Sequence, residues 1–524
     1  MALIVDVKLW GKDVGSLVWN EKADMAAFQY EPKFLRSKLD IAPITMPLKK
    51  SSEERVYQFP SNRNACFGGL PGLIADSLPD KFGTQIINEW FAAHGLPNEQ
   101  ITPLDRLCYV GRRGMGALEF EPCQKFTDLE TSSILHVEEL TKLADSIFNN
   151  RAAFQEKLIQ ENKAIIDVLK VGTSAGGAKP KAIIAYNNMT GEVRSGQVKA
   201  PEGFTYWLLK FDGTTYSEHD KITSNPQGIG NIEYAYYCMA KDSGIEMMES
   251  RLLTENDYSH FMTKRFDRLD NGEKLHVQTL AGISHYDRDT RHSYEEAFGI
   301  MRKMRLDYPQ MEEFYRRMVF NVVSRNHDDH TKNFSFLMNQ EGKWKLAPAY
   351  DLCYSYSPSG KWTNKHQMSL NGKQENFTYQ DLIDVAQNTG INKPDAIIEK
   401  TVETVSRWRD YAKDCGVKES HAKQIEENLI LLSKGIKVHP DHTYIPQELE
   451  LIRCIDNKDY TTLSALKEKG YSLPPKVIEH INNNSDNAVQ IAVRKIFGLS
   501  EGHEKIELAY GNAIPQEMEK GKEM

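Results

Sequence analysis

The sequence lacks a long apolar run, since nowhere are 18 consecutive residues all apolar. A helix that crosses a bilayer needs about 20 such residues, so no membrane span is predicted. The first residues, MALIVDVKLWGKDVG, meet charged side chains too early for the apolar part of an export signal. We therefore expect a cytoplasmic protein with no membrane partner.

Two further features are missing, an excess of basic residues and paired cysteines. The formal net charge is −8, which disfavours a protein that coats nucleic acid with its own surface, because such binding needs clustered Lys and Arg. The seven cysteines contain no CxxC pair, and their odd number disfavours a disulfide framework or a zinc site. We interpret them as reduced thiols that fill the core.

The composition is that of a folded globular chain, with 40% hydrophobic and 26% charged residues. A length of 524 residues suggests roughly three domains. Residues 1–130 mix short alternating segments with one helical pattern, which predicts an α+β unit. Its expected strands are 3–10, 15–20 and 26–30, and its expected helix is 84–93.

The remaining chain divides into three regions by pattern. Region 131–268 is expected to hold a small antiparallel sheet, region 269–437 is mainly helical, and region 438–524 has charged helical patches to which no role is assigned. The expected elements are helices at 137–148, 152–166, 231–243 and 311–323 and strands at 181–187 and 204–212.

The strongest functional pattern follows the amphipathic helix at 311–323. Asp328 and Asn333 reproduce the D-x-x-x-x-N spacing of a kinase catalytic loop, in which a carboxylate orients the substrate hydroxyl and an amide binds magnesium. Asp329 is a competitor for the base, but Asp328 keeps the register to Asn333. Asp351 follows the expected strand WKLAPAY, whose hairpin returns a second acid to the same place as a metal ligand. The alternative for such an Asp-rich loop is a solvated turn or a helix cap.

A lysine within a strand provides the second indication. Lys210 lies in WLLKF, where an unpaired ammonium would be costly to bury, and Glu233 on the following helix is a candidate partner. Kinases use such a strand Lys and helix Glu pair to position nucleotide phosphates. A lysine that snorkels from an edge strand is the alternative.

The segment 172–181, GTSAGGAKPK, joins two expected strands. Its small residues allow backbone N–H groups to approach an anion closely, although it matches no established phosphate-loop motif and a flexible turn is the plainer interpretation. Ser174 in this turn is a candidate phosphoacceptor.

Lys264 and Phe266, in KRFDR, lie where a two-lobed kinase has its linker, and Phe266 is a candidate contact for the base. His276 and His285 have no metal-binding spacing, so structural roles are expected.

Together these segments resemble the HipA family of bacterial toxin kinases, in order over roughly residues 15–435. Lys264 departs from the acidic or neutral residue common at its position, and the chain after about 436 extends beyond the family core. The segments that carry the resemblance are GTSAGGAKPKA, WLLKFD, NIEYAYYCMAKDSGI, KRFDR, NHDDHTKNFSF and APAYDL, with GLIADSLPDKFG and YVGRRGMGALEFEP resembling the family's N-terminal subdomain.

The resemblance implies an α+β, two-lobed protein-kinase-like fold. A small β-rich lobe (131–268) and a mainly helical large lobe (269–437) would be preceded by an N-terminal α+β subdomain (1–130) and followed by a helical C-terminal extension (438–524). It also implies roles for individual residues: Asp328 as catalytic base, Asn333 and Asp351 as Mg²⁺ ligands, Ser174 as an autophosphorylation site that shuts the kinase off, and ATP contacts from Lys210, Glu233, Ser174, Ala175, Gly176, Gly177, Lys181, Lys264, Phe266, His330, Asn333 and Asp351.

The partners implied by the resemblance are a helix-turn-helix antitoxin of the HipB type, DNA only indirectly through that antitoxin, and a protein substrate such as an aminoacyl-tRNA synthetase. The expected function is therefore that of an ATP-dependent Ser/Thr protein kinase toxin. The alternatives are a catalytically idle co-repressor or scaffold that binds a DNA-binding antitoxin, and a small-molecule or lipid kinase.

Overall fold

The computed structural model divides the chain into two compact units. The first comprises residues 1–425 with 432–435, and the second comprises 426–431 with 436–524. The residues described are 4–93, 95, 97, 100–122, 134–149, 179–218, 221–224, 226–432, 451–452, 454–468, 473–482 and 486–498.

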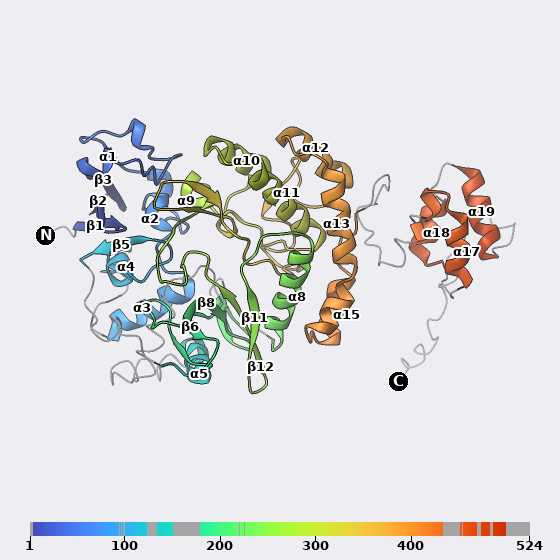
Figure 1. Cartoon of the computed structure of the whole chain (residues 1–524), viewed down its shortest axis with the longest axis horizontal. Helices are drawn as coiled ribbons and strands as arrows, with labels where there is room; N and C mark the ends of the chain where they lie inside the picture. The colour runs from blue at the N-terminus through green and yellow to red at the C-terminus, as the bar shows by residue number, and fades with distance from the viewer. Residues whose placement is uncertain are drawn as a thin grey trace, which may run out of the picture. The chain divides into compact units, whose positions relative to one another are not determined.

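The first unit begins with an antiparallel sheet in the order β4-β3-β2-β1-β5 (Figure 1). In β1 the apolar residues alternate with polar ones, so that Val5, Val7 and Leu9 all point into one core. Five strands make up this sheet: β1 (Ile4–Leu9), β2 (Lys12–Asn20), β3 (Met25–Tyr30), β4 (Val56–Tyr57) and β5 (Leu118–Glu121).

Short helices and turns fill the connection between β3 and β5. They are α1 (Pro32–Leu35), α2 (Gly72–Ala75), α3 (Lys81–Ala93) and α4 (Pro103–Val110), with single 3-10 turns at Leu48–Lys50 and Pro60–Asn62. At α2 the backbone packs closely on α9 (Leu280–Ser284): a Cβ on Gly72 would lie 2.1 Å from the carbonyl oxygen of Gly282. Only glycine fits this contact, which joins the N-terminal region to the helical region.

A second five-stranded sheet follows, in the order β11-β12-β8-β6-β7. Helices α3, α4 and α5 (Val137–Asn149) cover it: Phe82 and Ile86 of α3 and Leu140 of α5 share one core with Ile184 and Trp207 of the sheet. The strands are β6 (Lys181–Asn187), β7 (Val193–Ser195), β8 (Phe204–Lys210), β11 (Ser250–Glu255) and β12 (Tyr258–Lys264), and a separate hairpin is formed by β9 (Thr215–Glu218) and β10 (Lys221–Ser224).

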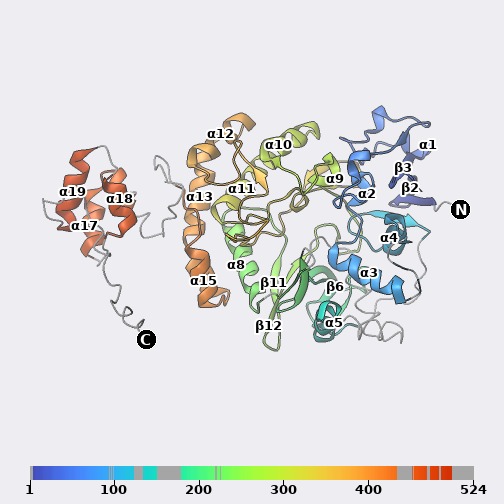
Figure 2. The same ribbon diagram turned by 180° about the vertical axis from the view of Figure 1, so that it is seen from behind.

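Helix α8 (Ile229–Asp242) packs against β12 and β11 (Figures 1 and 2). Its approach requires Gly230, because a Cβ there would lie 1.9 Å from the carbonyl oxygen of Ser259. The carboxylate of Asp212, just after β8, accepts hydrogen bonds from the N–H groups of Gly228 and Ile229 at 2.9 and 3.1 Å and so caps the helix. The strand and the helix are thereby fixed relative to each other.

The rest of the first unit is mainly helical around one small sheet in the order β13-β15-β16. The helices are α9, α10 (Tyr294–Lys303), α11 (Tyr308–Val323), α12 (Tyr379–Thr389), α13 (Pro394–Ser406), α14 (Trp408–Asp414) and α15 (Glu419–Glu426), with a 3-10 turn at Thr331–Asn333. The strands are β13 (His276–Thr279), β15 (Ser335–Met338) and β16 (Trp344–Leu346), and the short parallel pair β14 (His292–Ser293) and β17 (Met368–Ser369) lies apart.

The described part of the second unit contains α17 (Tyr460–Glu468), α18 (Pro475–Asn482) and α19 (Asn487–Phe497). Helices α17 and α19 pack on each other, with Leu463 and Val493 fully buried. Across the described residues of both units, none of the helices combines the length and apolarity that a bilayer crossing demands.

The elements expected from the sequence are mostly present. The strands at 181–187 and 204–210 and the helices at 81–93, 137–149, 229–242 and 308–323 lie within a few residues of their predicted bounds. The mixed α and β class is confirmed. The helix expected at 152–166 lies outside the described residues, and the two-lobed layout and the domain boundaries stay predictions.

Candidate functional site

The Asp-rich loop follows the end of α11 and is stabilised from within. Ser324 ends the helix, Arg325 takes a left-handed backbone conformation (φ 60°), and the buried Asn326 side chain donates to Asn321 Oδ1 at 2.9 Å. This turn carries the chain across the end of α11 into β15. The carboxylates of Asp328 and Asp329 therefore leave the loop in different directions.

Asp329 is sealed in the interior and Asp328 faces a cavity. Asp329 Oδ2 accepts from Tyr294 Oη at 2.7 Å and pairs with His366 Nδ1 at 2.9 Å, while its Oδ1 accepts from the Gln367 N–H at 2.8 Å. None of the Asp329 side chain is exposed, whereas 49% of the Asp328 side chain is. This geometry favours Asp328 over Asp329 as the reactive carboxylate.

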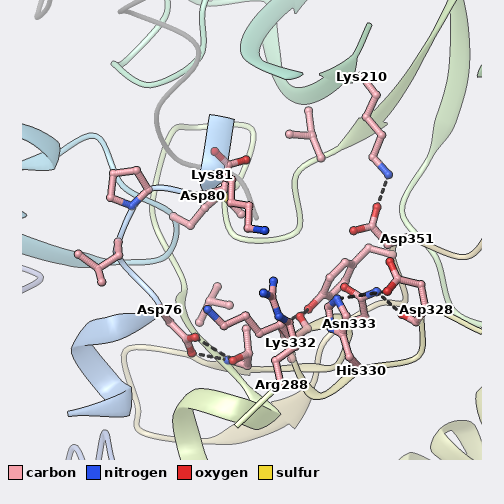
Figure 3. A pocket seen from close by; sticks show the side chains of 18 of the residues that line it. Asp76, Asp80, Lys81, Lys210, Arg288, Asp328, His330, Lys332, Asn333 and Asp351 are labelled. Atoms are coloured by element: carbon pink, nitrogen blue, oxygen red, sulfur yellow. Dashed lines mark hydrogen bonds and ion pairs between the residues drawn. The ribbon is translucent and has the colours of Figure 1, made fainter. Parts of the chain in front are cut away.

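The β15–β16 hairpin brings Asp351 back beside the loop. Its backbone is left-handed (φ 53°), which turns the carboxylate toward the end of β8, where it contacts the Lys210 amine (Figure 3). Lys210 Nζ also contacts Glu233 Oε1 on α8 at 2.5 Å. One ammonium thus joins two carboxylates that lie 118 residues apart in sequence, since 351 − 233 is 118.

Burial and charge perturb the acids and the base of this cluster. Burial lowers the pKa of Lys210, but Asp351 and Glu233 outweigh that effect and raise it above its ordinary value. Burial raises the pKa of Asp351, yet the Lys210 amine, helped by Lys181, lowers it to about 2. Burial also raises the pKa of Asp328, with His330 opposing the rise and Asp351 adding to it. Perturbation of this kind concentrates at functional sites.

Asn333 and Asp351 offer hard oxygen atoms to a cation. Asn333 Nδ2 donates to the Asp328 carbonyl at 2.7 Å, which orients the amide and leaves Oδ1 as its available acceptor. Asp351 uses Oδ1 for Lys210, and no described residue donates a hydrogen bond to its Oδ2. A carboxylate plus an amide oxygen is a ligand set that Mg²⁺ accepts, so the residues fit such an ion.

One cavity of about 820 Å³ is lined by Lys210, Glu233, Asp328, Asn333 and Asp351 together. Several parts of the first unit line it: the N-terminal region, the second sheet with α8, the segment from Phe266 through β13 to Arg288, and the Asp328 loop with its hairpin. Of the residues expected at the site from the sequence, eight line it: Lys210, Glu233, Lys264, Phe266, Asp328, His330, Asn333 and Asp351. Ser174, Ala175, Gly176 and Gly177 lie outside the described residues.

Lys181, the remaining residue expected at the site, is not among the residues that line the cavity. Its amine is buried and lies 3.5 Å from Asp80 Oδ2, at the start of α3. Burial raises the pKa of Asp80 to about 6, because the Lys181 amine and the Gly83 N–H compensate it only in part. His285 has a structural role, since its Nε2 accepts from the Gly72 N–H at 2.9 Å.

The residues that the N-terminal region contributes to the cavity were not predicted from the sequence. Asp76, Asp80, Lys81 and Met115 line it, and Asp76 accepts from the Thr279 N–H at 2.7 Å (Figure 3). The segments GLIADSLPDKFG and GRRGMG that contain them were recognised only as points of resemblance. Asp212, which fixes α8, was missed as well, because it lies 16 residues before Gly228 in the sequence and capping signals are local.

Two protein-family models match the chain. The model described as HipA N-terminal domain matches residues 5–121, and the model described as HipA-like C-terminal domain matches residues 173–425. Together they include every residue discussed in this site. The chain belongs to the HipA family.

Relatives and solved structures agree with this family. A Haemophilus influenzae protein named "Putative kinase" is 26% identical over 34% of this chain and 60% of its own length. "Putative kinase Y4dM" of Sinorhizobium fredii is 24% identical over 39% of this chain and 50% of its own length. The chain thus spans only half to three fifths of these two relatives.

A solved complex of HipA, HipB and operator DNA from the Shewanella oneidensis MR-1 toxin–antitoxin system shares the fold. The match has a TM-score of 0.53 at 16% identity and covers 80% of this chain and 94% of that chain. The family resemblance inferred from the motifs is therefore confirmed.

Proposed function

We propose that this HipA-family protein is an ATP- and Mg²⁺-dependent Ser/Thr protein kinase that acts as the toxin of a toxin–antitoxin pair. The observation that carries the proposal is the Lys210 amine between Glu233 and Asp351, in the same cavity as Asp328 and Asn333. This is the residue set that phosphoryl transfer requires, because the reaction depends on positioning and charge stabilisation more than on covalent chemistry.

Each residue has a role in this mechanism. Lys210, oriented by Glu233, would bind nucleotide phosphate oxygens, and Asn333 with Asp351 would hold the metal ion. When bound, Mg²⁺ neutralises phosphate charge. Asp328 would orient the acceptor hydroxyl and take its proton, and the raised pKa that burial causes suits a group that must accept one.

The finer expectations belong to the same proposal. The layout would be that of a two-lobed kinase, with residues 131–268 as the small lobe and 269–437 as the large lobe. Ser174 would be autophosphorylated, and nearly two added negative charges beside the nucleotide phosphates would inactivate the enzyme. A HipB-type antitoxin would be the partner, with DNA contacted only through it, and an aminoacyl-tRNA synthetase is the expected kind of target in the cytoplasm.

The test is phosphate transfer from labelled ATP by the purified full-length chain, alone and in a cell lysate. Wild type should label Ser174 and at least one other protein. Asp328→Asn should lower labelling roughly 10² to 10⁴-fold while ATP still binds. The adjacent Asp329→Asn is the matched control for mutation of the loop, since it should lower the melting temperature more than Asp328→Asn does.

Wild-type protein that binds ATP but labels nothing would contradict the proposal. Label on a lipid or an antibiotic, and on no protein, would instead establish a small-molecule kinase. Toxicity and repression that both survive Asp328→Asn would establish a scaffold.

A further inference from the structure

Two thiols meet where α8 packs on α14. Cys238 lies on α8 and Cys415 directly follows the last residue of α14. The Cys415 thiol donates a hydrogen bond to the Cys238 sulfur, and the two sulfur atoms lie 4.0 Å apart although 177 residues separate them in sequence. Both cysteines carry free thiols, as do the other cysteines that the structure describes. Two helices thus meet through a pair of atoms that oxidation can join.

The turn after α14 holds Cys415 in this position. Gly416 takes a left-handed backbone conformation (φ 70°), and the Val417 N–H donates to the Ala412 carbonyl at 2.8 Å, which closes the end of the helix. Asn231 of α8 donates from Nδ2 to the Cys415 carbonyl at 2.8 Å. A Cβ on Gly416 would lie 3.3 Å from the same amide nitrogen, so glycine suits this close approach. The backbone therefore presents Cys415 to α8.

The two thiols differ in exposure and acidity. Cys238 is partly exposed, whereas Cys415 is buried. The hydrogen bond from Cys415 lowers the pKa of Cys238 against the opposing effect of burial. The same bond, together with burial, raises the pKa of Cys415. Because the thiolate is the reactive form, a small oxidant meets the more acidic and more accessible sulfur first.

Cys353 shows that an accessible sulfur is not enough. This cysteine is also partly exposed, but burial raises the pKa of its thiol to about 12. It therefore stays protonated under conditions in which Cys238 forms thiolate more readily. What distinguishes Cys238 is the second thiol beside it.

We propose that Cys238 and Cys415 form an oxidation site, at which a peroxide converts the two thiols into an intramolecular disulfide that ties α8 to the end of α14. The proposal goes beyond the kinase activity and does not depend on it. The covalent link would lie on the same helix as Glu233, the partner of Lys210.

The reaction balances in two steps. The Cys238 thiolate attacks one oxygen of hydrogen peroxide: an S–O bond forms, the O–O bond breaks, hydroxide leaves, and Cys238 becomes a sulfenic acid. The Cys415 sulfur then attacks the Cys238 sulfur: the S–S bond forms, the S–O bond breaks, and the oxygen leaves as water with the proton of the Cys415 thiol. The two thiols are oxidised by two electrons, and the peroxide is reduced to water.

The first step prepares the second. As a sulfenic acid, Cys238 no longer contributes the hydrogen bond to a thiolate and the negative charge that raise the pKa of Cys415, so Cys415 ionises more readily. The sulfur atoms must approach from 4.0 Å to the roughly 2 Å of a disulfide. Cys415 lies at the end of a helix and not within one, so rotation of its side chain and a small shift of the turn supply this movement.

The test treats the full-length chain with hydrogen peroxide in slight molar excess and then alkylates the remaining thiols. Wild type should lose the mass of two hydrogen atoms, peptides that contain Cys238 and Cys415 should be linked, and dithiothreitol should reverse both changes. Cys238→Ser should give no linked peptide. Cys415→Ser should stop at the sulfenic acid, which dimedone traps. Cys353→Ser is the matched control and should link as wild type does.

Hydrogen exchange tests whether the disulfide ties the two segments. In oxidised wild type the amides of residues 236–242 and 415–417 should exchange several-fold more slowly than in the reduced protein, because local opening of one segment then has to move the other. Cys238→Ser treated in the same way should show no such slowing.

The outcomes that overturn the proposal are distinct. Wild type that gives no linked peptide, or peptides linked only through other cysteines, overturns the oxidation site. A disulfide between Cys238 and Cys415 without slower exchange overturns the tie between α8 and α14. No nucleotide is present in these measurements, so their failure leaves the proposed kinase activity as it stands.

Discussion

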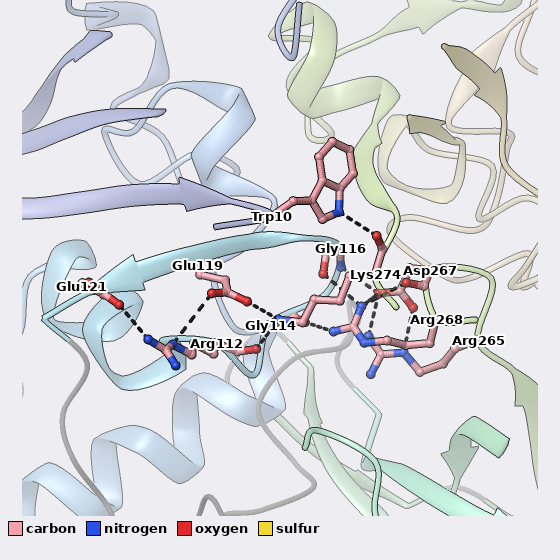
Figure 4. A network of polar contacts seen from close by, with 10 residues as sticks. All are labelled: Trp10, Arg112, Gly114, Gly116, Glu119, Glu121, Arg265, Asp267, Arg268 and Lys274. Carbon is pink, nitrogen blue, oxygen red and sulfur yellow. Dashed lines mark hydrogen bonds and ion pairs between the residues drawn. The ribbon is translucent and has the colours of Figure 1, made fainter. Parts of the chain in front are cut away.

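Two of the buried charge clusters in the described part of the first unit are built from acidic and basic residues in opposite proportion. At the site, one amine contacts two carboxylates, Lys210 with Glu233 and Asp351. The second cluster, which we call the joint, consists of Arg265, Asp267 and Arg268. Here the carboxylate of Asp267 contacts both guanidinium groups (Figure 4). The site thus carries one excess negative charge and the joint one excess positive charge.

The difference lies in what compensates the excess. At the joint the backbone carbonyl groups of Gly114 and Gly116 accept from Arg268, and no part of the Asp267 side chain is exposed. At the site the cluster borders the cavity instead, and 32% of the Asp351 side chain is exposed. A buried cluster whose carboxylate is sealed between its counter-charges stabilises the protein, whereas a cluster left with excess charge beside a cavity suits an ion or ligand.

The largest effect is expected from breaking the joint with Asp267→Asn. The variant leaves two buried guanidinium groups without a counter-charge, which costs about 3 to 5 kcal/mol of unfolding free energy. Urea unfolding measures it. The two arginines hold the pKa of Asp267 below its ordinary value against the effect of burial, so its contribution is present above about pH 4 and is lost as the pH falls further. A loss under 1 kcal/mol at neutral pH would refute the structural role.

The corresponding change at the site, Asp351→Asn, should lower the activity strongly and leave the stability almost unchanged. Phosphate transfer should fall roughly 10² to 10³-fold, because a charged ligand and partner of Lys210 is lost. Lys210 keeps Glu233, so the urea midpoint should stay near that of wild type. A variant that unfolds as readily as Asp267→Asn would remove the distinction between the two clusters.

Asp80 extends the comparison to a buried carboxylate for which nearby charge and hydrogen bonds offset only part of the cost of burial. Burial raises its pKa to about 6, and the Lys181 amine, 3.5 Å from Asp80 Oδ2, offsets this effect only in part. Between about pH 4 and 6 the folded state keeps a proton that the unfolded state has lost, so stability falls as the pH rises.

Asp80→Asn removes this titration. The stability of the variant relative to wild type should therefore rise on the order of 2 kcal/mol from pH 4 to pH 7, as measured by urea unfolding at each pH. A constant offset reflects only the lost contact with Lys181. A stability difference between variant and wild type that is the same at every pH would contradict the raised pKa of Asp80.

The smallest loss of stability is expected from Asp270→Ala, which removes an exposed ion pair close to the joint in sequence. Lys264 Nζ lies 2.8 Å from Asp270 Oδ1, and 66% of the Asp270 side chain is exposed. Solvent screens such a pair, so Asp270→Ala should cost less than about 1 kcal/mol in urea unfolding. A loss as large as that of Asp267→Asn would show that burial is not what separates the two aspartates.

Local pattern and spacing were sufficient for many of these features. A short apolar run located β6, alternation located β8, and apolar residues at helical spacing located α11. The D-x-x-x-x-N spacing led to Asp328 and Asn333, because both lie on one short loop whose geometry depends on few residues.

The features that were missed depend on contacts between distant segments. KRFDR was interpreted as a linker near the nucleotide, and its residues Lys264, Arg265 and Phe266 line the cavity. Asp267 and Arg268 turn instead to the loop around Met115. Asp329 and Asp328 are neighbours with the same side chain, and only the buried Tyr294 and His366, from other parts of the chain, separate their roles.

The sequence by itself determined most of the helices and strands, since these follow from periodicity along the chain. Motif spacing and resemblance led to the family and to Lys210, Glu233, Asp328, Asn333 and Asp351. The tertiary structure decided which acids face the cavity, which are sealed, and that Met115 reaches the same cavity as Lys210. Burial, counter-charges and close backbone approach decide these points, and all three depend on segments that lie up to hundreds of residues apart.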